Sequence, residues 1–111
     1  MSKRENDLLV KDILGCIERI EKYISGISFT QFVDDIKTQD AVIRNFSIIG
    51  EAATRFSESF QKGNPTIAFK EMKAFRNRII HDYSEVNYER IWDIIQLDLP
   101  HLKEELSKAK F

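Results

Sequence analysis

Hydrophobic residues recur at spacings of three and four along most of this 111-residue chain, which is the period of amphipathic α-helices. We expect Gly26 to close the first of these helices and Thr38 to cap the start of the second. No segment shows the strict alternation that is typical of a half-buried strand. The pattern therefore predicts four long helices, at about residues 9–24, 38–56, 67–83 and 88–106.

The segments between these helices are short. Residues 29–36 predict one or two helical turns lying across the bundle, and residues 84–87 predict a brief turn. Residues 57–65 hold Ser, Gln, Gly, Asn and Pro and predict a loop. Pro100 is expected to bend or interrupt the last helix, because proline cannot donate a helical hydrogen bond. Together these features predict an all-α fold, a four-to-five-helix up-and-down bundle that forms one domain over residues 1–111.

Composition narrows the class of protein. With 42% hydrophobic and 32% charged residues, the chain has the make-up of a soluble globular protein and not of a disordered one. Its one cysteine, Cys16, excludes an internal disulfide and fits a reducing compartment. No apolar run approaches the roughly 18 residues that span a bilayer, so we expect a cytoplasmic protein without membrane contact. The net charge of −1 indicates that any contact with RNA is weak and local.

The stretch Arg-Asn-Arg-Ile-Ile-His-Asp-Tyr, residues 76–83, holds the most informative chemistry. On a helix with about 100° per residue, Arg76 falls inside an apolar sector that also contains Tyr83. A buried charge costs several kcal/mol unless it is paired, so this position indicates either a functional site or a structural ion pair. Glu51 is the candidate partner, because Gly50 beside it would allow the two helices to approach closely.

The side chains around Arg76 suit reactions of phosphate esters. A guanidinium is a planar, always charged fork that matches phosphate oxygens, and it can stabilise charge on a transition state. His81 can exchange a proton near neutral pH, and Asn77 four residues earlier is placed to orient its ring if both lie on one helix. Arg78 is expected to contact the RNA backbone or an outer carboxylate. Tyr83 by itself reads as a core or interface ring.

The pattern Arg-x4-His-x-Tyr, with a polar residue directly after the arginine, resembles the signature of HEPN (higher eukaryote and prokaryote nucleotide-binding) domains. More narrowly, it is similar to HepT-like toxins of type VII toxin–antitoxin pairs. Residues 38–44, 48–52 and 91–100 resemble further blocks of that family, so the likeness runs from about residue 7 to residue 106. One departure is Phe69, which stands where relatives often carry tryptophan.

The resemblance implies a ribonuclease toxin that is silenced when a cognate minimal nucleotidyltransferase, the antitoxin, adenylylates Tyr83. Phosphates attached there would block the site and occupy its cation. We accordingly expect a metal-independent endoribonuclease without cofactors, which cleaves RNA by attack of the 2′-hydroxyl. Arg76 and His81 are the predicted catalytic residues, and Asn77, Arg78 and Glu51 are predicted to support them.

We also expect a homodimer in which the motif helices face each other across the two-fold axis, so that two Arg–His pairs line one cleft. A single Arg–His pair provides few catalytic groups, and we expect that a monomer cannot fully cover the apolar sector of the motif helix. Two other readings stay open. The chain can be a non-catalytic nucleotide-binding module or a docking subunit for a nucleotidyltransferase, or the motif can be purely structural.

Overall fold

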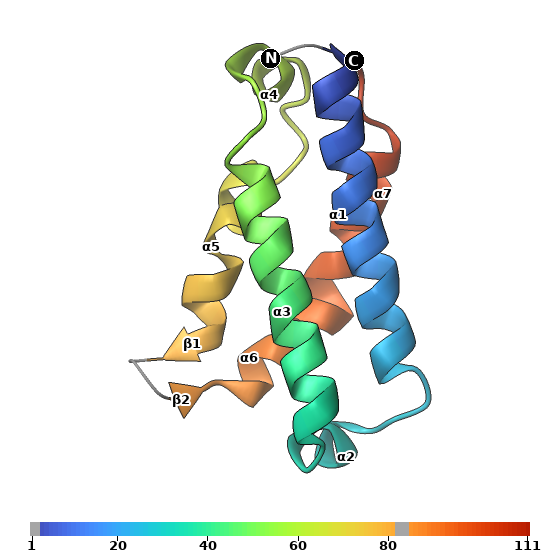
Figure 1. Cartoon of the computed structure of the whole chain (residues 1–111), viewed down its shortest axis with the longest axis vertical. Helices are drawn as coiled ribbons and strands as arrows, with labels where there is room; N and C mark the ends of the chain where they lie inside the picture. Colours follow the sequence, from blue (N-terminus) through green and yellow to red (C-terminus); the bar gives the residue numbers. More distant parts are fainter. Residues whose placement is uncertain (1–2, 82–84) are drawn as a thin grey trace.

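A computed structural model shows four long helical segments packed side by side, and it describes residues 3–81 and 85–111 (Figure 1). The side chains of Arg76, Ile80, His81 and Glu85 are not part of that description. The predicted all-α fold is confirmed. The long segments are α1 (Lys3–Ile24), α3 (Ile36–Ala53), α5 (Phe69–Ile79) and a last helix built from α6 (Tyr88–Asp93), η1 (Ile94–Asp98) and α7 (Leu99–Ser107).

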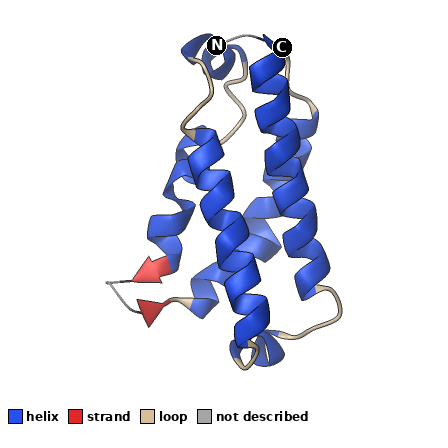
Figure 2. Ribbon diagram, in the orientation of Figure 1, coloured by secondary structure: helices blue, strands red, loops and turns tan. Residues whose placement is uncertain are grey.

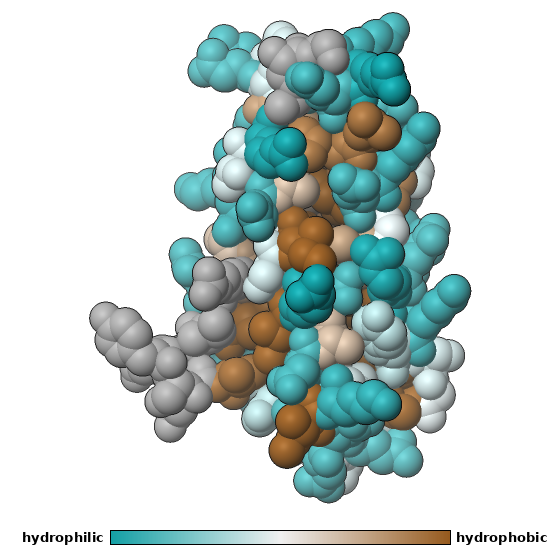
Figure 3. Space-filling view, in the orientation of Figure 1, coloured by the Kyte–Doolittle hydropathy of each residue, from teal (hydrophilic) through white to brown (hydrophobic). Residues whose placement is uncertain are grey.

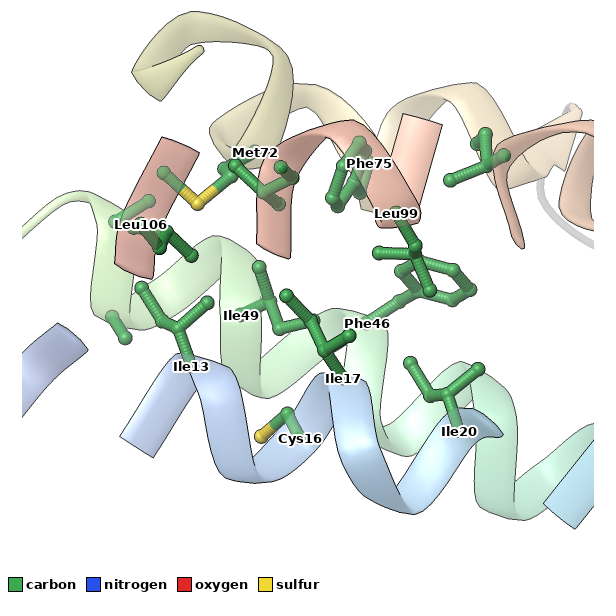
Figure 4. Close-up of a cluster of buried hydrophobic side chains, with 14 of the residues drawn as sticks. Ile13, Cys16, Ile17, Ile20, Phe46, Ile49, Met72, Phe75, Leu99 and Leu106 are labelled. Atoms are coloured by element: carbon green, nitrogen blue, oxygen red, sulfur yellow. The ribbon is translucent and has the colours of Figure 1, made fainter. Parts of the chain in front are cut away.

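The core lies between α1, α3, α5 and the last helix. Figure 4 shows the isoleucines of α1 facing Phe46 and Ile49 of α3, with Met72, Phe75 and Leu99 on the opposite side of the cluster. The face formed by α1 and α3 is mainly hydrophilic, with apolar side chains visible in the seams between helices (Figure 3). The three-to-four spacing therefore identified most of the buried positions, although Tyr23, which continues this spacing in α1, is exposed. Among the described residues, no helix is both long and apolar enough to cross a membrane.

Side-chain caps determine where α3 and its short neighbour begin. The Asp35 carboxylate accepts a hydrogen bond from the Thr38 amide (3.1 Å), so α3 begins at Ile36 and the predicted Thr38 cap is wrong. Thr38 instead donates its hydroxyl to the same carboxylate. Before it, α2 (Phe29–Val33) begins at a capping box in which Ser28 is the cap. As predicted, this segment makes a short helical turn.

The segment predicted as a loop at residues 57–65 contains the helix α4 (Glu58–Gly63), so that prediction is wrong. Ser57 caps this helix by accepting a hydrogen bond from the Phe60 amide (3.2 Å). The Phe60 ring is buried and stacks on Phe56, with ring centroids 5.0 Å apart. The cap and the buried ring outweigh the local turn composition.

Pro100 interrupts the last helix as expected. Immediately before it, residues 94–98 form a π-helical turn, in which the Leu99 amide donates to the Ile94 carbonyl five residues back. Pro100 lacks the N–H that would bond the Gln96 carbonyl, and its ring clashes with that oxygen in a regular α-helix. Widening the turn by one residue relieves this conflict.

The third long helix ends earlier than predicted. It stops at Ile79, and the chain continues as β1 (Ile80–His81), which pairs in antiparallel fashion with β2 (Glu85–Val86) (Figure 2). Cα partners are Ile80 with Val86 and His81 with Glu85. The prediction of a helix through residue 83 without any strand is therefore wrong. The Asn87 amide donates to the Ile79 carbonyl (2.9 Å), which satisfies an end group of α5 outside the helix.

Candidate functional site

The motif at residues 76–83 spans the junction between α5 and the hairpin. Arg76, Asn77 and Arg78 lie in the last turn of α5, whereas His81 lies in β1. The predicted i,i+4 helical relation between Asn77 and His81 is therefore wrong, because helical hydrogen bonding ends at Ile79. Asn77 is exposed. The side chains of Arg76 and His81, and Tyr83 as a whole, lie outside the described residues, so their predicted roles stay predictions.

Backbone contact with α3 fixes the position of α5. A Cβ atom added at Gly50 would lie 3.3 Å from the Met72 carbonyl oxygen and 3.7 Å from that of Lys73. The prediction that Gly50 permits a close helix approach is confirmed, since no larger residue fits there without a shift. Met72 precedes Arg76 by one helical turn, so this contact holds the helix that carries the motif. Glu51, the next residue of α3, is exposed, and its predicted pairing with Arg76 involves a side chain outside the description.

Arg78 is held on two sides. Its Nη2 donates to Oδ2 of Asp98 at 3.1 Å, and its guanidinium carbon lies 6.0 Å from the centre of the Phe75 ring. Two partners were predicted for Arg78, the RNA backbone or an outer carboxylate. In the structure Arg78 pairs with a carboxylate, that of Asp98. The side chains of Arg78 and Asp98 are 32% and 43% exposed, so the ion pair contributes at most about 1 kcal/mol to stability. Its main effect is to orient the guanidinium.

Beside this ion pair, an open groove of about 790 Å³ runs between α5 and the last helix; we call it the α5–α7 groove. Its polar lining comes from both sides, with Lys70, Glu71 and Arg78 on α5 and with Asp98 and His101 on the last helix. His101 has no candidate catalytic residue beside it in the sequence, but the fold places it in the groove wall opposite Arg78. The polar residues that meet across this groove are at least 20 positions apart in the sequence, so local sequence spacing could not predict their contact.

Cys16 takes no part in this region. It is fully buried on the inner face of α1 and accepts a hydrogen bond from Arg19 Nη2 at 3.4 Å. Burial raises the pKa of the thiol, although the bond from Arg19 partly opposes that rise. A buried thiol with a raised pKa is a poor nucleophile. In the described part of the chain, no three His, Cys, Asp or Glu side chains gather as a metal site would require.

Comparison with known proteins gives consistent results. Residues 13–109 match the family model described as ribonuclease HepT-like, a range that includes the whole motif. The chain is 37% identical to a Thermococcus cleftensis protein named "probable ribonuclease HepT", over 97% of this chain and 98% of the relative. It is 37% and 33% identical to two Methanocaldococcus jannaschii proteins named as candidate RNases, over 91% and 96% of this chain and 84% and 97% of theirs. No solved structure gives a significant match.

The family match covers most of the chain, and the all-α fold with the motif at the end of α5 agrees with the resemblance seen in the sequence. This chain belongs to the ribonuclease HepT-like family.

Proposed function

We propose that this protein is a metal-independent endoribonuclease with Arg76 and His81 as its catalytic residues. The observation that carries the proposal is the family match over residues 13–109, together with relatives whose names describe them as ribonucleases. The placement of the two residues supports it. Arg76 belongs to a helix packed against α3, and His81 lies two residues beyond the end of that helix in a paired strand.

The proposed reaction is transesterification followed by release of the downstream RNA. His81 takes the proton from a ribose 2′-hydroxyl, whose oxygen attacks the adjacent phosphorus. Arg76 donates hydrogen bonds to the non-bridging oxygens, which gain charge as five bonds form around phosphorus. The bond to the 5′-oxygen then breaks, and that oxygen takes up a proton from the His81 imidazolium, so that His81 acts first as base and then as acid. The products are a 2′,3′-cyclic phosphate and a 5′-hydroxyl.

The experiment is cleavage of single-stranded RNA in the presence of EDTA, with end-group analysis of the products. We expect both His81→Ala and Arg76→Ala to lower kcat/KM by about 100-fold or more. Arg55→Ala is the matched control, because Arg55 is exposed and lies outside both the motif and the groove. A 3′-hydroxyl product or a requirement for divalent metal would contradict the mechanism.

Thermal unfolding of the same variants separates catalysis from structure. If Arg76→Ala unfolds the chain, the motif is structural. If both variants keep the fold and the wild-type chain cleaves no RNA, the binding-module alternative is favoured, which also agrees with the net charge of −1.

We further propose a homodimer in which the two copies of α5 face each other across the two-fold axis. Each active site would then have a second Arg76 and His81 close by. The expected uncovered apolar sector does not support the dimer, because the large apolar residues described on α5 are already buried in one copy, namely Phe69, Met72, Phe75 and Ile79. Sedimentation velocity at micromolar concentration tests this, and a monomer at that concentration would count against it.

Finally, we propose that the chain is the toxin of a type VII toxin–antitoxin pair, silenced by adenylylation of Tyr83. The partner is a minimal nucleotidyltransferase. Intact-mass measurement after co-expression with such a partner should show one or more added adenylyl groups, mapped to Tyr83, and growth arrest should be lost. Tyr83→Phe should stay unmodified and toxic in the presence of the partner. An unchanged mass together with rescued growth would refute the adenylylation but not the ribonuclease activity.

A further inference from the structure

We propose that the α5–α7 groove is a binding subsite for the RNA backbone, in which Lys70 and Arg78 of α5 and His101 of α7 donate hydrogen bonds to phosphate oxygens. The proposal rests on the ribonuclease function proposed above. It concerns how the strand is held beside the motif and not how it is cut.

The chemistry of the two walls is suited to an anionic strand. Lys70 offers three ammonium donors, Arg78 offers a guanidinium, and His101 has at least one ring N–H in either protonation state. Of the two carboxylates at the groove, that of Asp98 is already bonded to Arg78. Glu71 remains as an opposing charge and limits affinity, in agreement with the weak, local RNA contact expected from the net charge.

Arg78 is pre-organised for such a contact. Only one of its five N–H donors, on Nη2, has a hydrogen-bond partner among the described residues. The bond to Asp98 and the packing against the Phe75 ring limit the freedom of the guanidinium before any ligand arrives. A phosphate bound to the remaining donors would therefore cost little additional side-chain entropy.

The shape and position of the groove also fit a nucleotide. Small side chains, Ala68 just before α5 and Ala74 within it, leave room in the groove, and its volume of about 790 Å³ falls in the range of small-molecule sites. Arg78 follows Arg76 by two residues and precedes His81 by three. Arg76 and Arg78 lie about 200° apart around α5, so a strand held in the groove reaches the motif by passing around the end of this helix. An internal cut requires the chain to be held on both sides of the cleaved bond.

The exposed side chain of Leu97, 69% accessible at the rim, is the one feature that suits a protein partner better. The two cations of the α5 wall and the ring N–H of His101 on the opposite wall favour RNA. Protein docking is therefore treated as an outcome that the experiment can detect.

The test compares four variants of the full chain, namely Lys70→Gln, Arg78→Gln, His101→Gln and the control Lys37→Gln. Lys37 is exposed in the first turn of α3 and does not line the groove, so its variant makes the same charge change elsewhere. Fluorescence anisotropy would measure Kd for a single-stranded RNA oligonucleotide that is 2′-O-methylated throughout, over a series of salt concentrations. This probe cannot be cleaved, because it lacks the 2′-hydroxyl nucleophile.

We expect Lys70→Gln and Arg78→Gln each to raise Kd about fivefold or more relative to Lys37→Gln, and to reduce the slope of log Kd against log salt by about one. His101→Gln should raise Kd by a smaller factor. Arg78→Gln also removes the tie to Asp98, so its unfolding midpoint must be checked. If that variant does not fold, the exposed Lys70 decides the result.

Other outcomes would overturn the proposal. If wild-type protein does not bind the probe, or if the groove variants match the control, the groove is not an RNA subsite. A changed sedimentation coefficient with unchanged Kd would mark it as a protein interface instead. Wild-type cleavage of unmodified RNA would then leave the ribonuclease function standing. Conversely, the groove variants could bind the probe more weakly than the control while the wild-type protein cleaves no RNA. That result would support the subsite and refute the catalytic role.

Discussion

Replacing Gly50 with alanine tests whether the contact between α3 and α5 is as close as the structure indicates. Two effects oppose each other. Alanine stabilises a helix interior by about 0.5–1 kcal/mol relative to glycine. The added Cβ, however, would lie 3.3 Å from the Met72 carbonyl oxygen, a backbone atom that moves only with α5. Overpacking of this kind costs about 1–3 kcal/mol, so we expect net destabilisation of about 1 kcal/mol.

Gly15→Ala provides the matched control. Gly15 also lies inside a helix, but its added Cβ would meet only the Arg19 guanidinium at 3.6 Å, which is an ordinary contact with a flexible side chain. This variant should gain the full helix-propensity term of about 0.5–1 kcal/mol. The difference between the two variants isolates the steric cost at the α3–α5 contact, because the propensity term is common to both.

Urea unfolding followed by far-UV circular dichroism measures both free energies of unfolding, and an unchanged m-value verifies that the comparison is valid. RNA cleavage should also fall in Gly50→Ala and not in Gly15→Ala, because a displaced α5 moves the Arg76 backbone. If Gly50→Ala stabilises the protein as much as Gly15→Ala does, the two helices are not in close contact and the reasoning is refuted.

Three further predictions concern other parts of the chain. Asn64→Ala should destabilise the fold by about 2–3 kcal/mol and speed amide exchange at Lys110, because the buried Asn64 side chain bonds both the carbonyl and the amide of that residue (2.9 and 2.7 Å). Hydrogen bonds from the Thr38 hydroxyl and amide lower the pKa of Asp35, so its stabilising effect is present above the ordinary aspartate pKa of about 4 and is lost as pH falls through the lower folded-state value. Urea midpoints measured against pH should thus show a shallower acid limb for Asp35→Asn, and an identical limb would argue against this assignment. The Cys16 thiol should react with a disulfide reagent only when the protein opens, and labelling at urea concentrations well below the unfolding transition would contradict its burial.

The sequence predicted the parts of the fold that depend on local periodicity. The inner face of α1, for example, follows from the spacing of its apolar residues, and all of Leu9, Ile13 and Ile20 are buried. The Gly50 approach was also predictable, because glycine inside a helix of good helix formers needs a packing reason.

Features that depend on distant partners were not predictable from local patterns. Nothing in Ile79 or Ile80 resembles a helix stop signal, and α5 ends there because Val86 and Asn87, farther along the chain, supply the pairing. The same holds for the candidate site. The meeting of Arg78 with Asp98 requires the packing of α5 against the last helix. Because α5 ends at Ile79, Asn77 and His81 do not lie on one helix, although the sequence pattern predicted that they would.

The π turn before Pro100 has a consequence for the length of the last helix. Ile91 and Leu106 both face the core, although the 15 positions between them amount to about 60° more than four full α-helical turns. The wider turn at residues 94–98 accommodates one surplus residue, equivalent to about 100°, and so reduces the offset between the two ends from about 60° to about 40° in the opposite sense. That surplus falls where Leu97 and Asp98 face the groove. A relative that is one residue shorter at this turn would keep the same core and present a different groove wall, so a single-residue insertion or deletion here changes the surface while leaving the fold intact.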